Sequence, residues 1–86
     1  MSAAAAALRR LGIEMCRLVA CVSHLATPEA MARRSLAKRV YQLARGCDRV
    51  RVELHAVCRL VGAPEATRRV LVTLDRQLDV LFARTP

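Results

Sequence analysis

Two cysteine–histidine pairs are the residues of this sequence whose types and spacing fit metal chemistry. Cys21 and His24 are three residues apart, and so are His55 and Cys58. Residues three apart share one face of a helix, so each pair could present two ligands. Together they would form a Cys₂His₂ set of the kind that binds zinc. The two pairs can meet only if the chain folds back between them.

Gly46 decides whether the chain folds back. It lies at the centre of the segment LAKRVYQLARGCDRVRVELHAV, residues 36–57. Apolar residues continue across it at alternating spacings of four and three, without a slip in register: Leu36, Val40, Leu43, Cys47, Val50, Leu54, Val57 and Val61. A turn would normally interrupt this phase, whereas one glycine inside a helix costs only about 1 kcal/mol. We therefore predict one continuous helix over residues 28–61.

A continuous helix separates the two pairs by roughly 40 Å, at 1.5 Å per residue, so we predict no metal site. In the alternative, Gly46 ends one helix and Asp48 begins the next. The chain would then form a four-helix bundle broken at Gly46, in which the two pairs could meet.

Catalytic signatures are missing from the sequence. It contains no glycine-rich phosphate loop and no nucleophile motif. Asp75 and Asp79 share a helix face, but Arg68 and Arg76 lie near them, which is typical of a solvated charged surface. We predict a protein that is not an enzyme, with no catalytic residues and no cofactor.

The remaining pattern predicts helices over residues 3–25 and 64–84 as well. Apolar seams spaced three and four apart run through both: Leu8, Leu11, Met15, Leu18, Val22 and Leu25, then Thr67, Leu71, Leu74, Leu78 and Leu81. Thr27, Pro28 and Glu29 form a helix start, and Gly62 with Pro64 forms a stop followed by a start. The predicted fold is a single all-α domain over residues 1–86, an antiparallel three-helix bundle or hairpin array with a long central helix.

Two features of these helices predict a partner. We expect all three to overlap only around residues 41–50, which would leave both ends of the long helix partly uncovered. The outer helices also carry apolar residues outside their seams, and such faces are typical of interfaces. As interface residues we predict Ile13, Val19, Val72, Val80 and Phe82. The predicted function is a protein–protein interaction module, a small scaffold or assembly subunit that forms homo- or hetero-oligomers.

The charge of the chain gives the alternative function. The formal net charge is +8, and all but one of the 15 basic residues are arginine, which binds phosphates and carboxylates in a bidentate way. Four basic residues fall opposite the central seam: Arg34, Lys38, Arg45 and Arg49. This basic face would fit an acidic protein surface, or the backbone of a nucleic acid bound by a subunit of a larger complex.

The four cysteines form no CxxC motif, and the sequence lacks a secretory leader pattern, so we expect free thiols in a reducing, intracellular compartment. Cytoplasm and nucleus fit this expectation. The Arg-bearing, acid-poor start of the chain also leaves the mitochondrion open. No apolar run approaches the roughly 20 residues that a membrane span needs.

Overall fold

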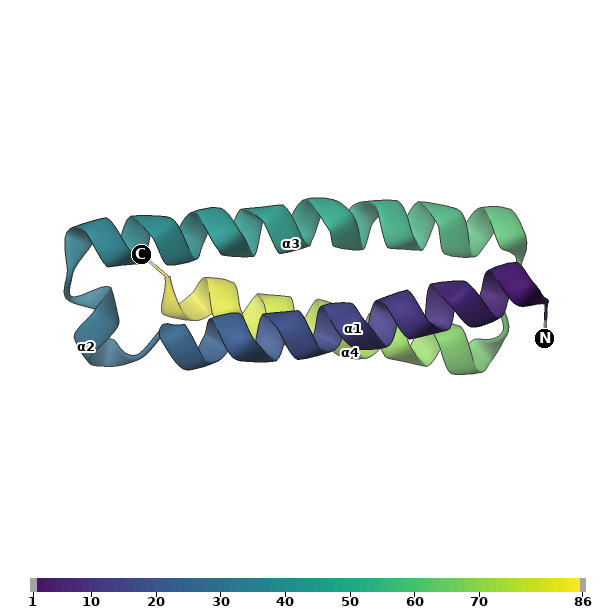
Figure 1. The fold of residues 1–86 in the computed structure, drawn as a ribbon, viewed down its shortest axis with the longest axis horizontal. Coiled ribbons are helices and arrows are strands. Elements are labelled where there is room, and N and C mark those ends of the chain that lie inside the picture. Colours follow the sequence, from purple (N-terminus) through teal and green to yellow (C-terminus); the bar gives the residue numbers. More distant parts are fainter. Residues whose placement is uncertain (1, 86) are drawn as a thin grey trace.

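A computed structural model describes residues 2–85, and four α-helices make up nearly all of this part (Figure 1). They are α1 (Ala3–Leu25), α2 (Pro28–Met31), α3 (Arg34–Val61) and α4 (Glu65–Arg84). The three long helices pack side by side into a body measuring 45 × 16 × 16 Å. α1 and α4 run in the same direction, and α3 runs antiparallel to both. The predicted all-α bundle with a long central helix is confirmed.

The helix ends follow the local signals in the sequence. Ser2 and Thr27 cap α1 and α2, since their hydroxyls accept hydrogen bonds from the backbone N–H groups of Ala5 and Ala30, both at 3.1 Å. α3 ends at Val61 and is capped by Gly62, whose φ of 59° lies in the left-handed region that glycine adopts most easily. Pro64 then precedes the first turn of α4.

α3 runs through Gly46 without a break, as the unbroken apolar phase predicts. Its 28 residues give a rod of about 42 Å. The predicted four-helix alternative with a turn at Gly46 is therefore excluded.

The predicted single helix over residues 28–61 is wrong at its start. α2 is only four residues long, the chain bends at Ala32 and Arg33, and α3 begins at Arg34. α2 lies across one end of the bundle, where Met31 packs against the core (Figure 1). The apolar repeat of α3 starts only at Leu36, so nothing in the pattern requires one helix axis before that residue.

The expected partial overlap of the helices is also wrong. α1 and α4 lie side by side along most of the body, so both accompany α3 over a long stretch (Figure 1). Arg84, at the end of α4, donates a hydrogen bond to the carbonyl of Ser23 near the end of α1, at 3.5 Å. Nearer the start of both helices, Gly12 lies against Val70. The bundle therefore leaves exposed faces along its length, rather than bare ends.

Leucines of α4 form the centre of the core. Its predicted seam is entirely buried: Thr67, Leu71, Leu74, Leu78 and Leu81. Val19 of α1 and Val40 of α3 join this centre with almost no exposed surface. α4 buries its whole seam, whereas α1 and α3 each keep apolar residues exposed on one flank.

Within residues 2–85, no helix combines the length and the apolar character that crossing a bilayer requires.

Candidate docking face between α1 and α3

The apolar seams of α1 and α3 are split between the core and the surface. In α1, Leu8, Met15 and Val22 are buried, while Leu11, Leu18 and Leu25 are 49%, 48% and 51% exposed. The same division occurs in α3, where Val40, Cys47 and Leu54 are buried and Leu43, Val50 and Val57 are exposed. The exposed residues of each helix are seven apart, so each set forms one continuous stripe.

The two stripes border one groove. Its middle part, a hollow of about 250 Å³, is lined by Met15 and Leu18 of α1 and by Gln42, Leu43, Gly46, Cys47 and Val50 of α3. We call the six exposed residues the α1–α3 apolar face: Leu11, Leu18, Leu25, Leu43, Val50 and Val57. Leu18, Leu43 and Val50 line the hollow, and the other three residues continue the two stripes by their spacing. Large apolar patches on a protein surface are often functional, so this face is a candidate interface.

Charged residues border the face on both helices. On α1, Arg17 and Glu14 form an exposed ion pair of 2.7 Å. On α3, Arg39 and Glu53 are exposed, and neither makes an ion pair with another residue in the part of the chain that the structure describes. Arg39, Gly46 and Glu53 are seven residues apart and therefore share one line along α3. Because Gly46 lines the groove, this line is its edge.

The predicted interface residues do not gather into one surface. Val19 is 0% exposed, so its expected outward position is wrong; α1 is rotated so that Val19 faces the core. Phe82 packs against the core and contacts Tyr41 edge to face, with ring centroids 6.2 Å apart. Ile13 is half-buried, and only Val72 and Val80 on α4 are well exposed.

The predicted basic face lies on the surface of α3. Arg34, Lys38, Arg45 and Arg49 are all exposed, and their spacings of four, seven and four place them along one side of the helix. The Arg45 guanidinium lies 5.9 Å from the centroid of the Tyr41 ring and donates a hydrogen bond of 3.2 Å to its hydroxyl. This side is about a third of a turn from the stripe of Leu43 and Val50, so the two surfaces are separate.

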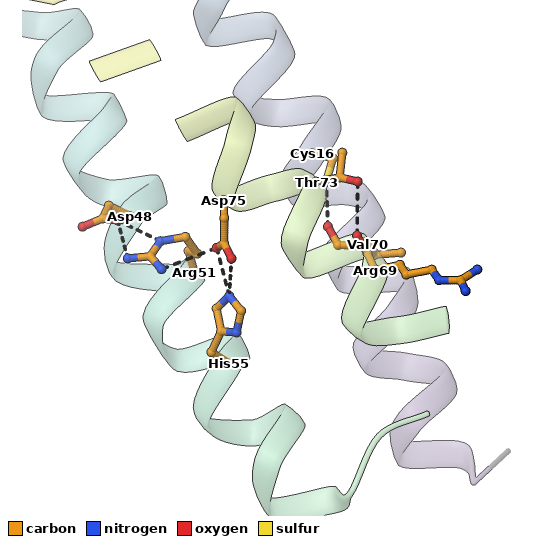
Figure 2. A network of polar contacts seen from close by, with 8 residues as sticks. All are labelled: Cys16, Asp48, Arg51, His55, Arg69, Val70, Thr73 and Asp75. Carbon is orange, nitrogen blue, oxygen red and sulfur yellow. Dashed lines mark hydrogen bonds and ion pairs between the residues drawn. The ribbon is translucent and has the colours of Figure 1, made fainter. Parts of the chain in front are cut away.

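A polar network links α3 to α4 (Figure 2). Asp75 accepts a hydrogen bond of 3.4 Å from Arg51, and its two oxygens lie 2.9 and 3.0 Å from Nε2 of His55. Arg51 also pairs with Asp48 at 2.8 Å. Partial burial opposes the charge of Arg51, but the bonds to both carboxylates outweigh it and raise its pKa. We interpret this network as a clip that fixes α4 against α3. The expected solvated position of Asp75 is therefore wrong, because its carboxylate is bonded to α3.

The two cysteine–histidine pairs lie at opposite ends of the molecule. Cys21 and His24 are in the last turns of α1, next to α2, whereas His55 and Cys58 are near the far end of α3 (Figure 1). Cys58 is buried and Cys21 is exposed. Among residues 2–85, no cluster of three or more histidine, cysteine or carboxylate side chains could hold a metal ion.

No protein-family model, curated protein or solved structure matches this chain. The residues of the α1–α3 apolar face belong to the predicted seams, but their spacing alone does not show which members of a seam face the core. One signal could have revealed it. Small residues such as Gly12 and Ala44 flank the seams and mark where helices approach closely.

Proposed function

We propose that this protein is a helical interaction module that docks another polypeptide on the α1–α3 apolar face. The observation that carries the proposal is the pair of exposed stripes along one groove. The partner must present an apolar helical surface, because side chains at intervals of seven along a groove fit a helix packed lengthwise.

The energetics support a partner of matching extent. Full burial of a leucine or valine is worth about 1.5–3 kcal/mol. Six residues that are already about half-buried would therefore gain about 1 kcal/mol each. Association costs roughly 4–15 kcal/mol in lost freedom of motion, which this face alone would barely offset. A partner that contributes a similar apolar face would make the complex stable.

Site-specific photo-crosslinking tests the proposal in cells that express the protein. The substitution Leu18→p-benzoylphenylalanine places the probe in the middle of the groove. The matched control is Val72→p-benzoylphenylalanine, since Val72 is 44% exposed but faces outward on α4. We expect position 18 to crosslink to an amphipathic helix of a polypeptide, identified by mass spectrometry, and position 72 not to do so. Equal labelling at both positions, or none at position 18, would refute the docking function.

The basic face supports a second candidate function, binding of a nucleic acid by its phosphate backbone. Four exposed basic side chains along one side of α3 would give a slope of log K against log salt of roughly −3 to −4. Titration of the protein with duplex and single-stranded nucleic acid at two salt concentrations measures this slope. Arg34→Glu combined with Arg45→Glu should abolish affinity that survives moderate salt. Arg9→Glu combined with Arg68→Glu changes the net charge equally and should retain it. Equal losses of affinity in both variants would indicate that the positive net charge attracts the nucleic acid without a defined binding site.

A further inference from the structure

We propose that the α1–α3 apolar face docks onto the same face of a second copy of this chain, about a two-fold axis that crosses the groove near Gly46. The inference rests on the proposed docking function and names its partner. An isologous contact of this kind requires a surface that is complementary to itself after rotation. Three features of the face meet that requirement.

The stripe on α3 is symmetric about the position between Gly46 and Cys47. Counting outward from that point, Leu43 and Val50 are equally distant, and so are Val57 and Leu36, which is half-buried against the core and continues the line of the stripe. When two copies of α3 pack antiparallel, Leu43 therefore meets Val50 of the second copy, and Leu36 meets its Val57. The two-fold axis repeats each of these contacts. Along the stripe, each apolar side chain therefore lies opposite an apolar side chain of the second copy.

The stripe on α1 is symmetric as well, and about the same axis. Leu11 and Leu25 are each seven residues from Leu18. Leu18 lines the same part of the groove as Leu43, Gly46 and Val50, the centre of the α3 stripe. A single two-fold axis through this part of the groove therefore aligns α1 antiparallel with α1 of the second copy while it aligns the two α3 helices. The four helices would form an antiparallel bundle with an α4 on each outer side.

The charges at the groove edge complement each other under the same rotation. Arg39 and Glu53 each lie seven residues from Gly46, in opposite directions. Antiparallel packing about the position between Gly46 and Cys47 brings Arg39 to within one residue, about 1.5 Å along the helix axis, of Glu53 of the second copy, and this pair forms twice. Neither residue has a competing ion pair among residues 2–85. If the two copies of α3 packed parallel instead, Arg39 of one copy would lie opposite Arg39 of the other, and the like charges would repel.

Gly46 and the size of the face also fit a second copy. A Cβ atom added at Gly46 would have no atom within 4 Å, so the glycine leaves open space at the axis, where two helices could approach closely. One long face of a body with extents of 45 and 16 Å has an area of the same order as the roughly 800 Å² per partner that stable interfaces bury.

Sedimentation velocity and light scattering coupled to size exclusion test the dimer with the intact chain, from micromolar to several hundred micromolar. We expect a concentration-dependent dimer that becomes tighter with added salt, because each copy carries a net charge of +8 and salt screens their repulsion. Leu43→Asp should weaken it by more than tenfold. Val72→Asp, at a residue of similar exposure on the outer side of α4, should leave it unchanged. Circular dichroism confirms that both variants stay helical. A monomer at every concentration, or a dimer that Leu43→Asp leaves intact, would overturn the inference.

A charge exchange tests the position of the axis. Arg39→Glu alone and Glu53→Arg alone each place like charges together twice, and each should weaken the dimer roughly tenfold. An equimolar mixture of the two variants restores opposite charges at both contacts and should regain the affinity of the original chain as a heterodimer. If the mixture is no tighter than the variants separately, the axis does not pass near Gly46.

Failure of this inference and failure of the docking function give different results. A chain that stays monomeric while Leu18→p-benzoylphenylalanine crosslinks to a different polypeptide would overturn only the second copy as partner. A crosslinked product with the mass of two chains supports both. No crosslink at position 18, together with a monomer in solution, would overturn both.

Discussion

Replacing Gly46 and Gly12 with alanine should change the free energy of unfolding in opposite directions. Both glycines lie inside long helices with ordinary negative φ values, so alanine removes the same backbone flexibility at each. That gain is worth about 1 kcal/mol per site. What differs is the space around the new methyl group.

At Gly46 the new methyl group meets nothing within 4 Å. Gly46→Ala should therefore stabilise the monomer by about 1 kcal/mol. At Gly12 the methyl carbon would lie 3.0 Å from Cγ1 of Val70 and 3.4 Å from Cδ2 of Leu71. Carbon atoms pack best about 3.5–4.0 Å apart, and Val70 cannot easily rotate away because β-branched side chains are stiff. Overpacking costs typically 1–3 kcal/mol, so Gly12→Ala should destabilise by about 1 kcal/mol on balance.

Thermal and urea unfolding followed by circular dichroism measures both changes, at protein concentrations low enough for the result not to depend on concentration. The expected shifts in Tm are about 4–8 °C upward for Gly46→Ala and a similar amount downward for Gly12→Ala. Gly62→Ala is a useful third variant. It has open space but a φ of 59°, so we expect a loss of about 1 kcal/mol from backbone strain alone.

Equal stabilisation by Gly12→Ala and Gly46→Ala would refute the close approach of α1 to α4, and with it the rotation of α1 that exposes Leu11 and Leu18. A loss of stability with Gly46→Ala would refute an ordinary helical conformation at that residue.

The polar network and the thiols give two further predictions. Asp75→Asn should lower the free energy of unfolding by about 1 kcal/mol, because it removes the charge that joins α4 to two side chains of α3; Asp79→Asn, at an exposed position, should change it by less than about 0.5 kcal/mol. Equal effects of the two variants would contradict the clip. Alkylation followed by mass spectrometry should modify the exposed Cys21 first and the buried Cys47 only on unfolding. Burial also raises the pKa of the Cys47 thiol above its ordinary value of 9.0. The unfolded chain therefore loses this proton first, and stability should fall as the pH rises above about 9. Early labelling of Cys47, or stability that is constant through this range, would contradict its burial.

The location of the helices could be predicted from local sequence signals. The bounds of α1 agree with the structure at both ends, and the caps at Thr27 and Gly62 lie where side-chain chemistry and backbone preference require them. Continuity through Gly46 followed from the unbroken apolar repeat. These features depend on interactions within one helix or across one turn, so the order of residues along the chain contains enough information to specify them.

The bend before Arg34 could not be predicted in the same way. A Thr-Pro-Glu helix start predicts where a helix begins, but not how long it continues. The bend becomes stable because α2 packs Met31 over the end of a core that only the folded bundle forms. The contacts of Asp75 with α3 are of the same kind, since they join residues 20 or more positions apart.

The sequence by itself determined that this chain is all-helical, that its central helix is long, and which stripe of each helix is apolar. Only the tertiary structure decided which half of each stripe is buried. α4 buries all of its stripe. α1 turns its small residue Gly12 toward α4 and buries Val19 in the core, which leaves Leu11, Leu18 and Leu25 at the surface. A heptad pattern fixes the spacing of apolar residues on a helix, but the rotation of that helix about its axis depends on the neighbours it packs against. The candidate docking face exists because that rotation leaves apolar stripes of α1 and α3 uncovered along the same groove.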